Sequence, residues 1–154
     1  AIFSMILLTV FSFFFSINAS NSKTKADREA QENARRVLDI ITYEIRSAKS
    51  IYTPTTTTNQ LSLQTSRYLP NDENNTFIDF FLCGSAICLK KESQNPVSLT
   101  SDSVEVTSLT FSQILNVTFQ SVKINLTVNY INPSNSVNSS ASVNLTSTAS
   151  LRSY

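Results

Sequence analysis

The sequence of 154 residues contains no histidine, no tryptophan and a single glycine. Without histidine, it lacks the side chain that most often serves as a general base or metal ligand near neutral pH. One glycine cannot form a glycine-rich loop that binds phosphate groups. The net charge is +1, and lysine and arginine form no basic cluster of the kind that binds nucleic acid. We therefore expect no enzyme activity, no catalytic residue, no cofactor, no bound metal and no small-molecule substrate.

Charge is also missing from the first 22 residues, which begin AIFSMILLTVFSFFFSINAS. Twenty apolar residues in a helix match the thickness of a bilayer core. A cleaved signal peptide is one alternative, although the best cleavage point, after Ala19, has the large residue Ile17 at position −3. A buried core helix is another. We favour a membrane-inserted helix that stays on the mature protein, and we expect the given sequence to begin inside that helix.

Residues 23–50 are, in contrast, rich in charge and hold about half of the chain's charged residues. Their apolar and small residues recur every three to four positions, which is typical of one face of an amphipathic helix. No proline or glycine occurs before Pro54. The sequence therefore predicts one continuous helix from Ala1 to about Ser50, made of an apolar part (1–22) and an amphipathic part (23–50).

The apolar part also has a stripe of small hydroxyl residues. Small residues at this spacing allow helices to pack closely, and they lie among bulky aromatic residues that would fill the same contact. An equally good interpretation is that the hydroxyls bond to carbonyl groups one turn earlier. The predicted helix-packing residues in the membrane or filament are Thr9, Ser12, Ser16, Phe11, Phe14 and Phe15.

Residues 51–154 have few charges, many Ser, Thr and Asn, and short runs of alternating apolar residues that favour strands. The runs at 122–130 and 143–151 predict a long antiparallel hairpin, and the change of phase at Thr107–Ser108 predicts a bulge or turn. We expect an antiparallel sheet of four to six strands in a head domain. Because the helix and the sheet each have one apolar face, the fold class is α+β with the helix packed on the sheet. The helix-to-sheet contact would use Val37, Leu38, Ile41 and Ile45.

The two cysteines lie in the segment CGSAIC, as Cys83 and Cys88. Two cysteines cannot complete a zinc site, and outside the cytoplasm such a pair forms a disulfide. We favour a disulfide, with free structural thiols as the alternative.

Asp79 lies in an apolar run, where alternation lets it face solvent. Six Asn-x-Ser/Thr motifs suggest N-glycosylation, but a chain this rich in Asn, Ser and Thr also produces them by chance: Asn18, Asn74, Asn116, Asn125, Asn138 and Asn144.

In its helix the chain resembles the type IV pilins and the pseudopilins of type II secretion. AIFSMILLTVFSFFF is similar to the part of their helix just after the processing motif. ARRVLDIITYEIRSAKSI is similar to the later part in W-type minor pilins and J-type pseudopilins. PVSLTSDSVEVTSLTF followed by VKINLTVNY resembles the minor-pilin layout of the sheet. The basic leader, the processing site and the Phe-Thr-Leu-x-Glu start of the family have no counterpart in this sequence, so their roles transfer to no residue here.

The resemblance implies a structural subunit of a type IV pilus or a type II secretion filament. Its partners would be other pilin subunits, the membrane and the assembly machinery. It would be a single-pass protein of the cytoplasmic membrane, with the head outside the cytoplasm, before it joins a cell-surface or periplasmic filament. Adhesion, competence and protein secretion are all compatible with such a subunit. The alternative is a signal-anchored surface glycoprotein with a β-rich binding domain.

Overall fold

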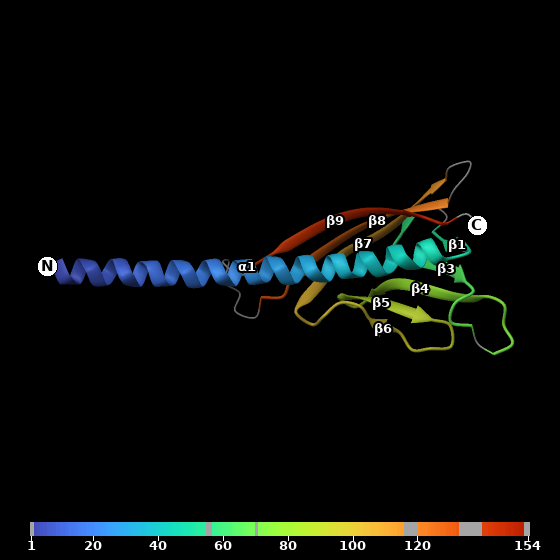
Figure 1. Ribbon diagram of the computed structural model, residues 1–154, viewed down its shortest axis with the longest axis horizontal. Coiled ribbons are helices and arrows are strands. Elements are labelled where there is room, and N and C mark those ends of the chain that lie inside the picture. The colour runs from blue at the N-terminus through green and yellow to red at the C-terminus, as the bar shows by residue number, and fades with distance from the viewer. Residues whose placement is uncertain (1, 55–56, 70, 116–119, 133–139, 153–154) are drawn as a thin grey trace.

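The computed structural model describes residues 2–54, 57–69, 71–115, 120–132 and 140–152. Within these residues, one long helix, α1 (Ile2–Ser47), is followed by nine strands. The first half of α1 (residues 2–22, the apolar half) projects away from the strands. The second half (residues 23–47) lies along them (Figure 1). The predicted α+β class, with a long N-terminal helix packed on antiparallel sheet, is confirmed.

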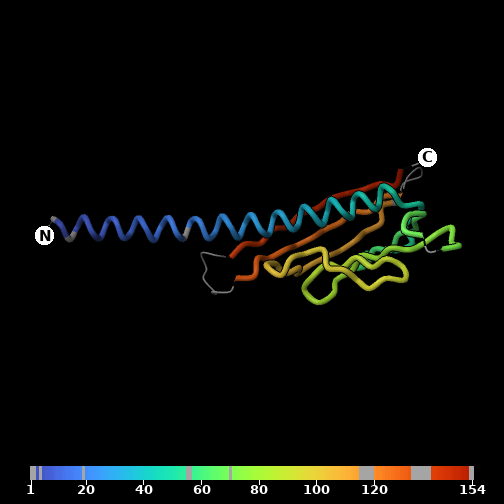
Figure 2. The backbone as a smooth tube through the Cα atoms, turned by 60° about the horizontal axis from the view of Figure 1, so that its bottom comes forward, coloured from blue at the N-terminus to red at the C-terminus, as the bar shows by residue number. Residues whose placement is uncertain are grey.

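The helix α1 runs through 46 residues without interruption, as the absence of proline and glycine predicts. It ends at Ser47, slightly before the predicted end, and Ala48 N–H then bonds to the Ile45 carbonyl at 3.2 Å. On its solvent side Arg28 pairs with Glu32 one turn later, at 2.7 Å. The view in Figure 2 shows the same straight path from the free end to the strands.

The strands form two antiparallel sheets, so the prediction of one sheet is wrong in this respect. A five-stranded sheet has the order β1-β3-β4-β5-β6, and a four-stranded sheet has the order β2-β7-β8-β9. The strand bounds are β1 (Ser50–Thr53), β2 (Thr57–Thr58), β3 (Leu61–Thr65), β4 (Thr76–Cys83), β5 (Ala86–Lys91), β6 (Val97–Ser98), β7 (Val104–Leu115), β8 (Gln120–Tyr130) and β9 (Ser142–Ser150).

The four-stranded sheet contains the long hairpin that the sequence predicts. β8 and β9 pair without a register shift, with Leu126 opposite Leu145. β7 and β8 also pair along their length, and the register shifts between Val106 and Ser108. The predicted irregularity at this point is therefore confirmed as a bulge, and it moves the apolar residues before and after it onto one buried face.

The core forms where the second half of α1 meets this face. Ala26, Ala30 and Ala34 have no exposed surface, and their small side chains let the backbone of the helix approach the strands closely. Larger residues follow along the same stripe: Val37, Ile41 and Ile45 are fully buried and Leu38 is 8% exposed. They share one cluster with the inward residues of both sheets, including Phe80 of β4, Phe111 of β7 and Ile124 of β8. Burying each such side chain contributes about 1.5–3 kcal/mol.

A disulfide closes the β4–β5 hairpin between Cys83 and Cys88, as predicted, and its Cα atoms lie 5.8 Å apart. Gly84 in the turn has φ of 71°, a left-handed conformation that glycine adopts without strain. The next residue connects the two sheets, because the Ser85 carbonyl accepts a hydrogen bond from Val106 N–H of β7 at 2.7 Å. The disulfide therefore stiffens the turn that joins one sheet to the other.

Candidate functional site

The most unusual surface of the molecule is the first half of α1. Its large apolar side chains are exposed on every side of the helix, with exposed fractions from 42% for Leu7 to 77% for Phe3. Soluble proteins rarely leave an apolar surface of this extent uncovered. The exposed residues are Phe3, Met5, Ile6, Leu7, Leu8, Val10, Phe11, Phe13, Phe14, Phe15 and Ile17. Such a surface requires lipid or other protein around it.

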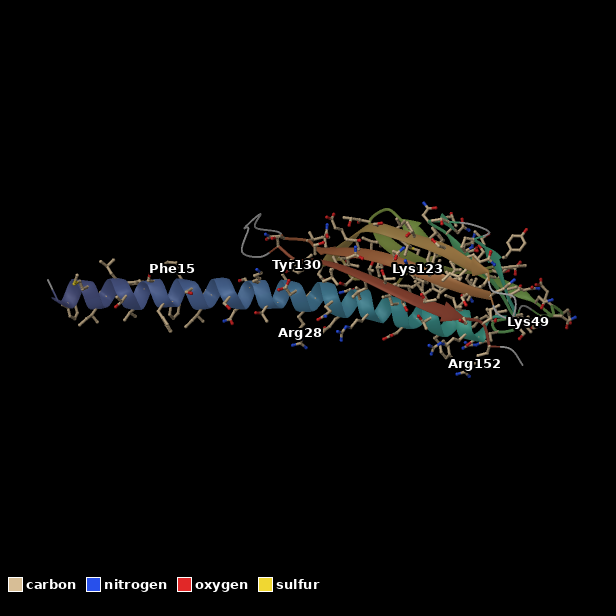
Figure 3. All side chains as sticks on the ribbon, turned by 90° about the horizontal axis from the view of Figure 1, so that it is seen from above. Phe15, Arg28, Lys49, Lys123, Tyr130 and Arg152 are labelled. Carbon is tan, nitrogen blue, oxygen red and sulfur yellow. A yellow bond between two sulfur atoms is a disulfide. The ribbon has the colours of Figure 1, made fainter. Side chains whose placement is uncertain are left out.

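By length and composition, this helix can cross a membrane. Its apolar window has none of its surface buried within the protein, so the alternative of a buried core helix is wrong for this part of the chain. A signal sequence near an N-terminus has the same composition, and that alternative stays open. Figure 3 shows Phe15 on the bare part of the helix, well away from the sheets.

The hydroxyl stripe of this half shows one of its two predicted behaviours. The Thr9 hydroxyl donates a hydrogen bond to the Ile6 carbonyl at 2.8 Å, so at this residue the hydroxyl bonds to its own helix. Thr9 also lines a shallow hollow with Val10, Phe13 and Phe14. Ser12 and Ser16 are exposed, as are Phe11, Phe14 and Phe15. Contact of these residues with another helix stays a prediction.

At the opposite end of the head, a polar and aromatic cluster joins α1 to the segment after β3. Glu44 is buried, and its Oε1 accepts a hydrogen bond from the Tyr68 hydroxyl at 3.1 Å. Its Oε2 lies 3.5 Å from Arg67 Nη1, which makes an ion pair without a hydrogen bond of good geometry. The Arg67 guanidinium lies 4.9 Å from the centre of the Tyr43 ring and 5.1 Å from that of Tyr68. These contacts fasten the β3–β4 connection to the last turns of the helix.

Tyr68 is the centre of this cluster. Its backbone has φ of 60°, a conformation that is uncommon for a tyrosine. Lys91 Nζ lies 3.7 Å from the centre of its ring. Partial burial, and then the charge and hydrogen bond of Glu44, raise the pKa of the Tyr68 hydroxyl above its ordinary value. This cluster was not predicted from the sequence, although a glutamate between the core residues Ile41 and Ile45 signals a buried carboxylate that needs partners.

No group of three or more His, Cys, Asp or Glu that could hold a metal ion occurs in the described part of the chain. Asp79, an acid within the apolar strand β4, is half-buried and accepts a hydrogen bond from Ser62 on the neighbouring strand. It also lies opposite Lys90 in the β4–β5 register. These contacts give Asp79 a role in strand pairing.

The glycosylation motifs differ in their accessibility. Asn18, Asn74 and Asn144 are exposed, whereas Asn116 and Asn138 lie outside the described residues. Asn125, on the outer face of β8, is half-buried and bonded on both sides: its amide donates to Thr110 at 3.2 Å and its carbonyl accepts from Thr146 at 2.9 Å. In the folded head, Asn125 is therefore the least accessible of the four described motifs.

Comparison with protein-family models, with curated proteins and with solved structures finds no match to this chain.

Proposed function

We propose that this protein is a structural subunit of a filament of the type IV pilus or type II secretion kind, as a minor pilin or pseudopilin. One observation carries the proposal. One continuous helix contains both an apolar half with exposed side chains and a second half that is buried against the sheets, with no linker between them. A membrane anchor alone does not require this continuity, whereas a subunit that must pass from lipid into a helical bundle does.

In this proposal the apolar half has one role in the membrane before assembly and another in the filament after it. Before assembly it crosses the cytoplasmic membrane, and the head lies on the outer side. During assembly it leaves lipid and packs against the same segment of neighbouring copies. Because lipid tails are as apolar as leucine, the bundle would depend on close packing of side chains rather than on removal of apolar surface from water. The residues for that packing are the exposed ones beside Ser12 and Ser16.

The alternative is a surface glycoprotein anchored by the same helix. The exposed positions of Asn74 and Asn144 favour it, since both are reachable by a glycosyltransferase on the folded head. The two functions need the same membrane segment, and they differ in how the N-terminus is processed and in whether copies assemble.

The experiment that separates them is mass spectrometry of the N-terminus of the native protein. A processed and methylated phenylalanine upstream of Ala1, with a glutamate soon after it, would support the filament subunit. An unprocessed basic start, or cleavage near Ala19, would contradict it and favour an anchored or secreted β-rich domain. The same spectra would show whether Asn74 and Asn144 carry glycans.

Assembly itself can be tested at Ser12. The substitution Ser12→Leu keeps the segment apolar, so insertion into the membrane should be unchanged, while close approach of a second helix should be obstructed. We expect fewer sheared filaments with the same amount of protein in the membrane fraction. The matched control is Leu8→Ile, which preserves side-chain volume. Normal assembly of the Ser12→Leu variant would contradict the packing role of the hydroxyl stripe.

A further inference from the structure

The end of the head that faces the apolar half of α1 has its own distinctive geometry. We call it the base, and it consists of the end of β8 with Ile131, the residue before β9 (Ala141), and Ala26 and Glu29 of the helix. Ile131 N–H donates to the Ser103 carbonyl at 2.9 Å, and Tyr130 N–H donates to the Ala141 carbonyl at 2.9 Å. The Ser103 hydroxyl in turn donates to Glu29 Oε2 at 3.3 Å. These hydrogen bonds therefore fix the position of the base along the axis of α1.

Along this axis the base lies very close to the end of the uncharged segment (1–22). The last uncharged residue before the charged run is Ser22, and Ala26 already has no exposed surface. Four residues of helix correspond to about 6 Å. The polar layer on each side of a bilayer core is about 5–8 Å thick. If the apolar half crosses a membrane, Ala26 therefore lies within the headgroup layer, and Glu29, about 10 Å after Ser22, lies at its outer edge.

The side chains at and just before the base are of the types found at phospholipid headgroups. Lys23 and Lys25 are exposed directly after the uncharged segment, where their ammonium groups can reach lipid phosphates, and the first carboxylate follows only at Asp27. Ile131 is 41% exposed at the base, although it is a large apolar residue. Tyr130 beside it is half-buried, and tyrosine is enriched at membrane interfaces. In Figure 3 Tyr130 and Arg28 lie at the same end of the head, whereas Lys49 lies at the far end.

We infer that the base of the head is a lipid-contact surface, with Ile131 and Tyr130 in the phospholipid headgroup layer and Lys23 and Lys25 at the phosphates. This inference rests on the proposed membrane-held state. It adds that the head lies directly on the bilayer, so that the Tyr43–Tyr68 end points away from it. The second half of α1 places the two ends of the head about 30 Å apart.

A single introduced tryptophan tests the inference, because the chain has none of its own. The full-length chain with Ile131→Trp is placed in phosphatidylcholine vesicles in which part of the lipid is brominated near the glycerol backbone. We expect weaker fluorescence than in vesicles without bromine, and in both kinds of vesicle an emission maximum at shorter wavelength than that of a tryptophan exposed to water. The matched control is Tyr52→Trp, at an exposed residue of β1 in the far part of the head, which should keep its fluorescence. Equal protease resistance of both variants shows that they are folded.

A second measurement needs no substitution. A phospholipid with a photoreactive headgroup should label the unaltered chain at 130–132 and at Lys23 and Lys25, and leave Tyr52 and Tyr68 unlabelled. If the chain does not sediment with the vesicles at all, the membrane-held state and the inference both fail. If it sediments, but the fluorescence of the Ile131→Trp variant is not quenched and 130–132 is not labelled, only the inference fails, and the head stands clear of the lipid.

Discussion

The two halves of α1 share one continuous backbone and differ in which side chains they carry and in how those side chains are distributed around it. In the first half, Phe13, Phe14 and Phe15 point in different directions and each is more than half exposed. In the second half, apolar residues such as Ile41 and Ile45 form one stripe, and that stripe is fully buried. A helix that is apolar all round needs an apolar environment, whereas one with a single apolar stripe needs one protein surface. The change from one pattern to the other marks where the surroundings of the helix change.

The strongest test of this contrast between the halves is a charge on the buried stripe. Ile41→Asp places an unpaired carboxylate in the core, and we expect it to lower the free energy of unfolding of the head by about 3–5 kcal/mol. Urea unfolding of the full chain in detergent micelles, followed by circular dichroism, measures this. Gln31→Asp, at an exposed position of the same half, is the control and should have little effect. An unchanged midpoint for Ile41→Asp would mean that the helix does not cover the sheets.

The same charge in the first half should have the opposite pattern of effects. Phe14→Asp changes no contact of the head, so the unfolding midpoint of the head should be unchanged. Insertion should become less favourable by about 3 kcal/mol, because a carboxylate would lie inside the bilayer core. Sedimentation with phosphatidylcholine vesicles measures the loss, with Phe14→Leu as the control. Full retention in the vesicle fraction would argue against a membrane-crossing role of this half.

A change within the sheets should leave both halves of the helix unaffected. Replacing both Cys83 and Cys88 by serine opens a very short loop, and the expected destabilisation of the head is about 2 kcal/mol. The urea midpoint of the double variant, compared with that of the single turn variant Ser85→Ala, gives this value. Vesicle binding should be the same for all of these chains. A larger loss of stability would indicate that the turn holds the two sheets together more strongly than its one hydrogen bond to Val106 suggests.

The smallest effect is expected where the second half of α1 ends. Tyr68→Phe removes the hydroxyl that donates to Glu44, and we expect a loss of about 1 kcal/mol because water can partly replace this bond. The control is Tyr52→Phe, at an exposed tyrosine. Equal midpoints for the two variants would show that the Glu44 bond does not contribute to the stability of the head.

The pH dependence of this bond follows from the raised pKa of Tyr68. Above the ordinary tyrosine value of 10.0, the unfolded chain loses the proton while the folded chain still holds it, so the stability of the head falls as the pH rises. Below that value the contribution is fully present. Urea midpoints measured on both sides of pH 10 should therefore decline less steeply for Tyr68→Phe than for the unaltered chain.

The sequence was sufficient to predict the features that depend on local periodicity. The continuous helix, the β8–β9 hairpin and the bulge before Ser108 each follow from a spacing of apolar residues that lies within one segment. The short distance between the cysteines likewise allowed the disulfide to be predicted. In all of these cases the interacting residues are close in the sequence or lie on adjacent runs.

What could not be predicted depends on contacts between distant segments. Alternation shows that a strand has a buried face but not which sheet it joins, so the division into two sheets was missed. β2 and β6 are two residues long and have no periodicity to detect. The pairing of Glu44 with Tyr68 joins residues 24 positions apart, across a change from helix to strand. The only trace of it in the sequence is a carboxylate beside buried isoleucines.

The direction of α1 relative to the strands has a mechanical consequence. The helix lies lengthwise along β8 and β9, so a pull on its free end loads the whole buried stripe from Ala26 to Ile45 in shear at the same time (Figure 1). A peeling force would instead separate the contacts one after another and need less force at each step. Since α1 has no proline or glycine to act as a hinge, tension would pass from the apolar half to the head without bending the joint between them.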